Sequence, residues 1–263
     1  MAGTMKLTIC HLYPDLMDTY GDWGNIQTLI KRCQWRNIDA RVVDTSLGER
    51  LKNDCDIYFF GGGQDKTQEI VSVDLLKNKK GLLKIANDDA VILAICGGFQ
   101  LLLNYFKTIE GKTLQGLGIF KGYTQGSQAR MIGNLQIELN PILKNQISNI
   151  YKPVTSNKLP VTNLIGYENH SGKTYLENGC KPLGKVLKGN GNNGEDKTEG
   201  AIYKNAIGCY LHGSLLPKNP HFADYLIAKA LVKKYGKADL IPLDDTLEWQ
   251  AHQTTAKRIR STP

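Results

Sequence analysis

Apolar and polar positions follow one another along this chain with two different periods. Short, largely apolar runs that are typical of strands cover residues 6–13, 40–43, 56–60 and 91–95. Between these runs, apolar residues recur with helical spacing from Asn25 onward and over residues 67–76 and 82–86. Strands that alternate with helices in this way predict βαβ units around a mostly parallel sheet. We therefore expect an α/β fold with helices on both faces of the sheet.

The pattern changes after residue 106. Short alternating runs, separated by Gly and Asn, predict antiparallel additions to the sheet over residues 133–139, 164–168 and 207–211. Residues 189–200 are almost wholly polar and rich in turn formers, so we expect a surface loop there. Asn219-Pro220 is a typical helix start and Gly236 a typical stop, which predicts a helix over 220–235. We divide the chain into a main domain, 1–243, and a C-terminal helix with a basic tail, 244–263.

The most informative stretch is the apolar run 91–95 followed by Cys96-Gly97-Gly98-Phe99-Gln100. Helical spacing continues through Phe106, so Cys96 is predicted at a turn between a strand and a helix. The free N–H groups of that helix start point at the thiol and favour the thiolate. Two interpretations remain open: a nucleophile, or a small buried apolar residue. A phosphate-binding turn is disfavoured, because no Gly-Lys-Ser/Thr and no G-x-G-x-x-G pattern is present.

Composition narrows the class of protein. The chain has 263 residues, a net charge of +8 and a pI near 9.0, with Lys scattered along it. Scattered Lys is typical of a solvated face, with an anionic partner or a membrane surface as the alternative. No basic stretch is interleaved with aromatic residues, so we expect no nucleic-acid binding. Its six Cys show no C-x-x-C pair, which predicts free thiols, no metal site and a cytoplasmic location. No apolar run reaches the ~20 residues of a membrane span.

A thiol nucleophile requires a base, and His212 is the best placed of the five His. It directly follows the apolar run 207–211, at a strand end; His170 is the second candidate, and either could instead be a structural hydrogen-bonding residue. Attack on a carbonyl also creates an oxyanion, which backbone N–H groups stabilise best. The triple glycine 61–63, together with the N–H of Gly97, could supply these groups, although triple Gly also serves an ordinary tight loop.

These motifs resemble those of class I, triad-type glutamine amidotransferases: Cys96-Gly-Gly-Phe-Gln100, the upstream Gly-rich loop and Tyr210-Leu-His-Gly213. Tyr20-Gly-Asp-Trp-Gly-Asn25 and Gly166-Tyr-Glu-Asn-His170 resemble the cobyric-acid-synthase-like branch. Within it, Gly61-Gly-Gly-Gln-Asp65 and the Asn-rich segment 189–200 are similar to the glutaminase subunits of lipid II isoglutaminyl synthases. The resemblance extends to about residue 240. It implies a flavodoxin-like sheet and an amidotransferase domain over residues 1–243.

The resemblance also implies a role for each catalytic position. Cys96 would attack the carboxamide carbon of L-glutamine, form a γ-glutamyl thioester and release ammonia. His212 would act as the general base and then as acid and base for thioester hydrolysis. Gly63 and Gly97 would provide the N–H donors of the oxyanion hole.

The family pattern implies a substrate clamp as well. Gln100 would hold the substrate, and Arg130 would pair with its α-carboxylate, since guanidinium offers bidentate geometry. The alternative for Arg130 is a surface ion pair. We expect Glu168, Asn169 and His170 to form a wall of the site.

One departure from the family pattern concerns the third member of the triad. Many members carry a Glu two residues after the catalytic His, whereas this chain reads His212-Gly213-Ser214. Either another carboxylate of this chain replaces it, or a partner subunit supplies one. In the second case the isolated chain would be a poor glutaminase, because an imidazole without its orienting carboxylate loses much of its rate advantage.

The resemblance finally implies a partner. Ammonia would pass to a Mur-ligase-like (MurT-like) synthetase subunit in a hetero-oligomer, which amidates the stem-peptide D-glutamate of lipid II to D-isoglutamine in peptidoglycan biosynthesis. This chain has no P-loop, so we expect no cofactor here, and ATP and Mg on the partner ligase. The basic tail 257–260 suggests a peripheral approach to membrane-borne lipid II. The alternatives are another acceptor, such as a corrinoid or nucleotide carboxylate, a partner-independent Cys hydrolase, and a non-enzymatic module with Cys96 as a redox sensor.

Overall fold

The computed structural model describes residues 4–152, 154 and 162–261, and its main sheet confirms the predicted α/β fold. The strand order is β11-β12-β4-β3-β1-β2, with five parallel strands and β11 antiparallel at one edge. The strands are β1 (Lys6–Leu12), β2 (Asp39–Thr45), β3 (Ile57–Phe60), β4 (Val91–Ile95), β11 (Ala201–Tyr203) and β12 (Ala206–Cys209). Every residue of β3 and β4 is buried, which explains their continuous apolar runs.

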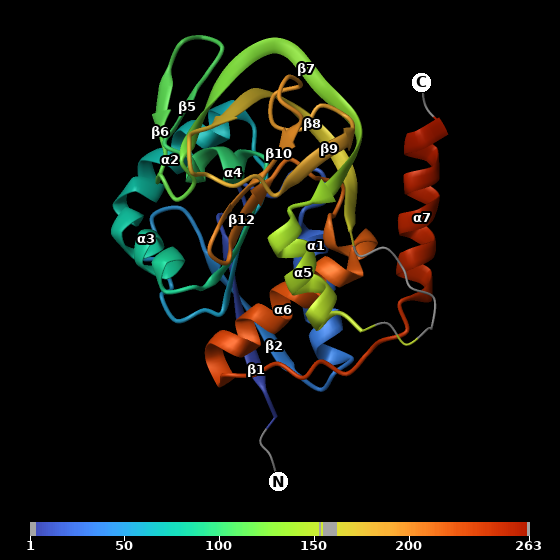
Figure 1. Ribbon diagram of the computed structural model, residues 1–263. Coiled ribbons are helices and arrows are strands. Elements are labelled where there is room, and N and C mark those ends of the chain that lie inside the picture. Colours follow the sequence, from blue (N-terminus) through green and yellow to red (C-terminus); the bar gives the residue numbers. More distant parts are fainter. Residues whose placement is uncertain (1–3, 153, 155–161, 262–263) are drawn as a thin grey trace.

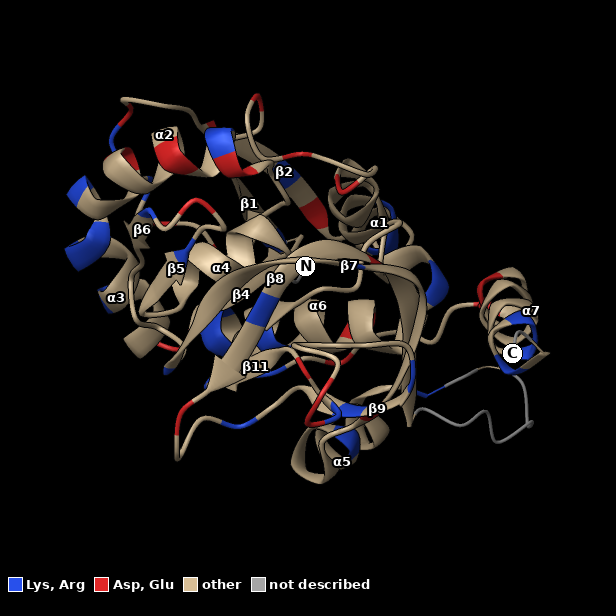
Figure 2. Ribbon diagram, turned by 90° about the horizontal axis from the view of Figure 1, so that it is seen from above, with Lys and Arg blue, Asp and Glu red and all other residues tan. Residues whose placement is uncertain are grey.

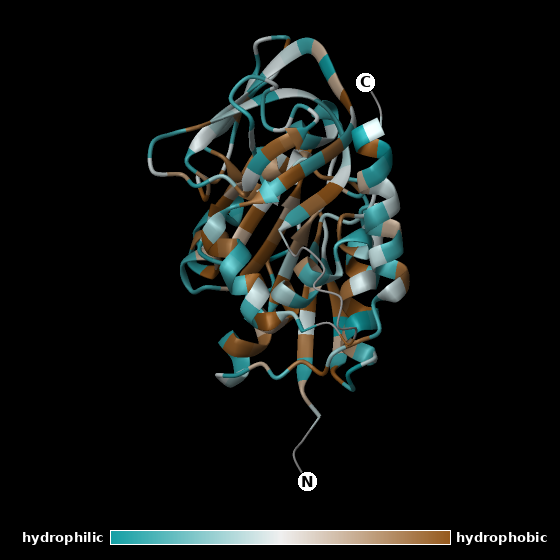
Figure 3. Ribbon diagram, turned by 45° about the vertical axis from the view of Figure 1, so that its right-hand side comes forward, coloured by the Kyte–Doolittle hydropathy of each residue, from teal (hydrophilic) through white to brown (hydrophobic). Residues whose placement is uncertain are grey.

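Helices cover both faces of this sheet. Figure 1 shows α2 and α3 on one side and α1 and α6 on the other, and Figure 3 shows the apolar strands enclosed between them. The helices are α1 (Trp23–Gln34), α2 (Asp65–Lys77), α3 (Lys79–Asn87), α4 (Gly97–Leu102), α5 (Pro141–Ile150), α6 (Pro220–Tyr235) and α7 (Thr246–Ser261). The predicted bounds of α6 are confirmed, and Gly236 ends it in the left-handed region at φ 77°.

Most of the predicted antiparallel additions form a second sheet rather than an extension of the first. It consists of β5 (Tyr105–Lys107), β6 (Thr113–Gln115), β7 (Gly122–Leu139), β8 (Asn163–Leu176), β9 (Gly184–Lys188) and β10 (Thr198–Glu199). The long β7–β8 ribbon arches over the carboxyl ends of the first sheet (Figure 1). Contrary to the prediction, β12 is not an antiparallel addition, because it pairs parallel to β4 in the main sheet.

Two local predictions are also corrected. The helix after Cys96 ends at Leu102 and does not reach Phe106. Leu103 is extended, and Phe106 belongs to β5, which pairs with β7. The segment 189–200 is not simply a surface loop. Asn192 and Asn193 are buried and turn their side-chain amides inward, where the Asn192 side chain bonds the backbone of Gly200. Buried backbone groups need hydrogen-bond partners, and here side-chain amides provide them, which explains how so polar a segment can be buried.

A buried ion network fastens α1 to α6 and to the segment before α7. Arg32 donates to both oxygens of Asp224 at 2.6 and 2.8 Å and to both oxygens of Asp245 at 2.6 and 3.0 Å. Tyr151 donates to Asp245 at 2.7 Å and accepts from Trp249 of α7 at 2.8 Å. The C-terminal helix is therefore held against the main domain by buried polar contacts.

The charges on the remaining surface are mixed. Figure 2 shows basic and acidic positions interspersed along α2, whereas α7 begins with an acidic position and ends with basic ones. In the part of the chain that the structure describes, no helix combines the length and the apolar character that a membrane crossing requires.

Candidate active site

Cys96 lies at a strained bend between β4 and α4. Its backbone adopts φ 48° and ψ −105°, a conformation that non-glycine residues rarely take and that is concentrated at functional sites. A Cβ on Gly98 would lie 2.5 Å from the carbonyl oxygen of Phe60, so only glycine allows α4 to start this close to β3. The bend resembles a nucleophile elbow, in which the reactive side chain is raised above the end of the sheet.

His212 follows β12, and its backbone is hydrogen-bonded to Tyr167 of β8 in the second sheet. Its backbone N–H donates to the carbonyl of Tyr167 at 2.8 Å and its carbonyl accepts from Tyr167 at 3.2 Å. Its Nδ1 lies 3.3 Å from Oδ1 of Asp22, and both side chains are fully buried. A carboxylate at Nδ1 fixes the orientation of an imidazole and leaves Nε2 for the nucleophile. A carboxylate of this chain therefore lies where a third triad residue is expected, which supports the first of the two alternatives.

The charges at this site favour a protonated His212. Burial alone favours the neutral imidazole, but the neighbouring Cys96 sulfur and Asp22 carboxylate outweigh burial and raise the pKa of His212 to about 10. A protonated imidazole is the form that can deliver a proton to a leaving amine. By contrast, burial lowers the pKa of His170 to about 4, and its Nδ1 is engaged by the carbonyl of Gly172 at 2.8 Å. Of the two imidazoles, His212 is therefore the one whose surroundings favour the protonated form.

The triple-glycine loop after β3 adjoins the elbow. A Cβ on Gly97 would lie 2.9 Å from the backbone nitrogen of Gly63, so these two backbones meet beside Cys96. Asp22 also holds this loop, because its Oδ2 accepts the N–H of Gly62 at 2.8 Å. One carboxylate thus orients both the imidazole and the loop that is expected to supply an oxyanion donor.

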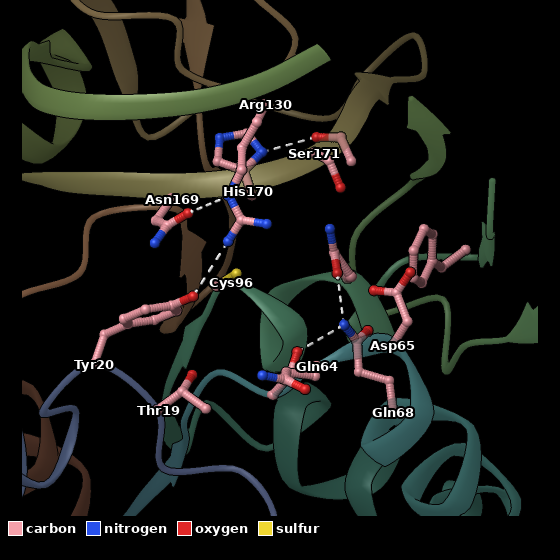
Figure 4. Close-up of a pocket in the computed structure, with 14 residues that line it drawn as sticks. Thr19, Tyr20, Gln64, Asp65, Gln68, Cys96, Arg130, Asn169, His170 and Ser171 are labelled. Atoms are coloured by element: carbon pink, nitrogen blue, oxygen red, sulfur yellow. Dashed lines mark hydrogen bonds between the residues drawn. The ribbon is translucent and has the colours of Figure 1, made fainter. Parts of the chain in front are cut away.

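A pocket of about 380 Å³ opens above the thiol. Figure 4 shows Arg130, Asn169 and His170 around Cys96, and Gln100 also lines the pocket. Gly63 lines the pocket too, so the structure brings together six of the residues that the sequence predicted. The pocket volume suits a single amino acid better than a large cofactor.

The amide of Gln100 is held in place from both ends. Its Oε1 accepts from Gln68 at 3.0 Å, and its Nε2 donates to the hydroxyl of Tyr210 at 3.0 Å. Gln68 Nε2 in turn donates to the carbonyl of Gly63 at 3.0 Å. Gln100 therefore presents a fixed amide to the pocket.

Glu168 does not line this pocket, contrary to the prediction. Its buried carboxylate points to the segment 189–200 and accepts three hydrogen bonds at 2.8 Å, from the backbone and side chain of Asn190 and the backbone of Gly191. These donors satisfy a charge that would otherwise be unpaired in the interior. Glu168 thus fastens this segment to β8.

The sequence did not indicate Tyr20, Asp22 or Gln68 as site residues. Tyr20 and Asp22 belong to the segment between β1 and α1, whose position at the carboxyl end of a strand was the available signal. Arg130 makes its described hydrogen bonds to Asn169 and Tyr20, not to a carboxylate. Among the described residues, no group of three or more His, Cys, Asp or Glu is arranged to hold a metal ion.

Comparison with known proteins agrees with this geometry. The model of the CobB/CobQ-like glutamine amidotransferase domain matches residues 8–220. The chain is 40% identical, over 90% of its length and 85% of the relative, to the lipid II isoglutaminyl synthase (glutamine-hydrolyzing) subunit GatD of Streptococcus pneumoniae. It is 38% identical to the subunit of the same name from Staphylococcus aureus, over 96% of each chain.

The fold has counterparts among solved structures. PurLQS from Thermotoga maritima superposes with a TM-score of 0.52 at 15% identity, over 96% of this chain and 100% of that chain. At this level of identity, the likeness supports the fold alone.

Proposed function

The chain belongs to the family of CobB/CobQ-like glutamine amidotransferases, and we propose that it hydrolyses L-glutamine and supplies the ammonia to a ligase that amidates lipid II. The observation that carries this proposal is the Cys96 thiol in the lining of an amino-acid-sized pocket, with the buried pair of His212 and Asp22 behind it. The identity to two glutamine-hydrolyzing subunits of lipid II isoglutaminyl synthase supports the choice of substrate and acceptor.

The proposed reaction begins with the Cys96 thiolate and the His212 imidazolium. The sulfur forms a bond to the carboxamide carbon, and the oxygen of the tetrahedral intermediate accepts hydrogen bonds from the N–H groups of Gly63 and Gly97. His212 gives its proton to the departing nitrogen, so the C–N bond breaks and ammonia leaves. The product is a γ-glutamyl thioester on Cys96 beside a neutral imidazole.

Water completes the cycle. The neutral His212 takes a proton from a water molecule, whose hydroxyl adds to the thioester carbon. The C–S bond then breaks, glutamate leaves, and the thiolate and imidazolium are regenerated. The role of Asp22 is to hold Nδ1 throughout, so that Nε2 faces the reacting atoms. Arg130, at the pocket wall, would bind the substrate α-carboxylate.

The acceptor reaction belongs to a second subunit. The word "subunit" in the names of both relatives implies a partner for those proteins, and we extend it to this chain. We propose a Mur-ligase-like, MurT-like partner that binds ATP and Mg and activates the D-glutamate carboxylate. The proposed location is the cytoplasm, where both nucleotide and precursor are made.

Covalent labelling tests the nucleophile. The purified chain is treated with a glutamine-analogue chloroketone, and the intact mass is measured. We expect one adduct, lost in Cys96→Ala and retained in Cys180→Ala, whose thiol is more exposed. An adduct that persists in Cys96→Ala would reject Cys96 as the nucleophile.

Isotope transfer tests the acceptor. With the partner ligase, ATP and lipid II, amide-¹⁵N-glutamine is expected to place ¹⁵N in the D-isoglutamine of the stem peptide. If glutamate is released but no ¹⁵N is transferred to lipid II, lipid II is rejected as the acceptor and the glutaminase activity stands.

A further inference from the structure

Tyr20 connects two parts of the site that carry different functions. Its hydroxyl accepts a hydrogen bond from Nη2 of Arg130 at 3.3 Å. Its ring packs edge-on against the imidazole of His212, with ring centroids 5.1 Å apart and an interplanar angle of 71°. Figure 4 shows the Tyr20 hydroxyl pointing toward the Arg130 guanidinium, to one side of Cys96. The same side chain therefore contacts the expected substrate clamp and the general base.

We propose that Tyr20 is a positioning residue that fixes the guanidinium of Arg130 over the pocket for the carboxylate of the substrate and packs the imidazole of His212 in its reactive orientation. This inference rests on the proposed function, because it assumes that Arg130 binds the α-carboxylate of glutamine. It adds a residue to which neither the sequence motifs nor the comparisons assign a role.

The pattern of donors on Arg130 supports this role. Nε donates to Asn169 Oδ1 at 2.8 Å, and Nη2 donates to Tyr20. Both contacts lie on the Nε–Nη2 edge of the planar group, so the edge that carries Nη1 can pair with a carboxylate. Arg130 is exposed, and a long exposed side chain populates many rotamers unless it is held. Tyr20 and Asn169 hold it from two directions.

The backbone of Tyr20 is itself held in an unfavourable conformation. Tyr20 has φ 58°, in the left-handed region that non-glycine residues rarely adopt. Flanking contacts maintain it: Thr19 N–H donates to Gly62 O at 3.2 Å, and Ser214 Oγ donates to Gly21 O at 2.5 Å. Strain that the surroundings impose at one residue is typical of sites where a side chain must take a defined position.

Steady-state kinetics on the full-length chain test the proposal. Tyr20→Phe removes the hydroxyl and keeps the ring. We expect KM for L-glutamine to rise about fivefold, the effect of one hydrogen bond, and kcat to change less. Tyr20→Leu removes the ring as well, so kcat is expected to fall further and the pH profile of kcat to shift. The matched control is Tyr203→Phe. Tyr203 lies on β11, is similarly exposed, and its hydroxyl donates a hydrogen bond to the Asn87 side chain at 2.7 Å.

Each outcome bears on the proposal. A KM for Tyr20→Phe equal to that of Tyr203→Phe would overturn the positioning of Arg130. A pH profile and a kcat for Tyr20→Leu equal to those of Tyr20→Phe would overturn the contact with His212. In both cases wild-type turnover still supports the proposed function, whereas a wild-type chain that hydrolyses no glutamine, alone or with its partner, rejects the function itself.

Discussion

His212 Nδ1 and Asp22 Oδ1 lie 3.3 Å apart although 190 residues separate them along the chain. His212 follows β12 and Asp22 precedes α1, and the main sheet brings both elements to the carboxyl ends of its strands. Both side chains are fully buried, so their interaction is little screened by solvent. The orienting carboxylate that the His212-Gly213-Ser214 motif lacks is thus present elsewhere in the same chain.

Asp22→Asn is expected to lower kcat for glutamine hydrolysis about 100-fold or more, because the amide favours the wrong tautomer of the imidazole. Its remaining oxygen can still accept from Gly62, so the oxyanion loop should stay in place. Glutamate release by the isolated chain measures the effect. Asp18→Asn, in the same segment, is the control. Full activity of Asp22→Asn would reject Asp22 as the residue that orients His212 and would favour a carboxylate from a partner subunit.

The pKa of His212 is expected to fall when Cys96 is replaced by Ala. The charge at the Cys96 sulfur is one of the causes that raise this pKa above its ordinary value of 6.5, and alanine removes it. A ¹⁵N NMR titration of the histidine side chains measures the change, with His212→Gln used to assign the signal. An unchanged titration would mean that the sulfur and the imidazole do not interact.

The nucleophile elbow was predictable because its signals are local. A continuous apolar run, a Cys and two Gly within ten residues define the bend, and the structure places Cys96 there. The length of α4 was not predictable, because Phe106 continues the helical spacing while its pairing in β5 depends on the distant β7. A periodic pattern describes local preference, and tertiary pairing overrides it.

Asp22 and Glu168 show the same limit for the site. The sequence indicated that a carboxylate was missing beside His212, but pairing across 190 residues leaves no periodic signal. Glu168 belongs to a motif with Asn169 and His170, yet only the latter two line the pocket, because donors in segment 189–200 turn Glu168 away. Residue type predicted the chemistry, whereas the direction of each side chain depended on tertiary contacts.

Gly24→Ala is expected to disrupt the site, and Ser214→Gly in the same chain is expected to restore much of it. A Cβ on Gly24 would lie 2.1 Å from Oγ and 2.9 Å from Cβ of Ser214, and glycine removes both atoms. Ser214 has φ 47°, which suits glycine. The measurements are glutaminase activity and thermal unfolding of the two single variants and the double variant. A double variant no better than Gly24→Ala would contradict this steric explanation.

Asp245→Ala is expected to destabilise the fold by about 3–5 kcal/mol, the usual cost of removing one partner from a buried ion pair. Arg32 would lose two of its contacts, and Tyr151 would lose its acceptor. Urea unfolding followed by circular dichroism measures the loss. Asp39→Ala is the control, because its pair with Lys6 is exposed and spans 4.0 Å; we expect a change within about 0.5 kcal/mol. Equal effects of the two substitutions would show that the buried contacts of Asp245 stabilise the fold no more than the exposed pair of Asp39 and Lys6.

Glu199 is expected to make stability depend on pH. Its side chain is fully buried, and although its Oε1 accepts the N–H of Tyr210 at 2.6 Å, burial raises the pKa of its carboxyl from 4.5 to about 8. Between these values the folded state binds the proton more tightly than the unfolded state. The resulting stabilisation is fully present below 4.5 and is lost as the pH rises through about 8.

Glu199→Gln removes this titration. The free energy of unfolding of the wild type, relative to that of Glu199→Gln, should therefore decrease from about pH 5 to about pH 8. Urea unfolding at both pH values measures the difference. In Glu195→Gln the same comparison should stay constant, because the bond to Lys173 lowers the pKa of Glu195 below 4.5, outside this range. A wild type whose stability relative to Glu199→Gln stays constant over this range would show that Glu199 keeps an ordinary pKa in the folded protein.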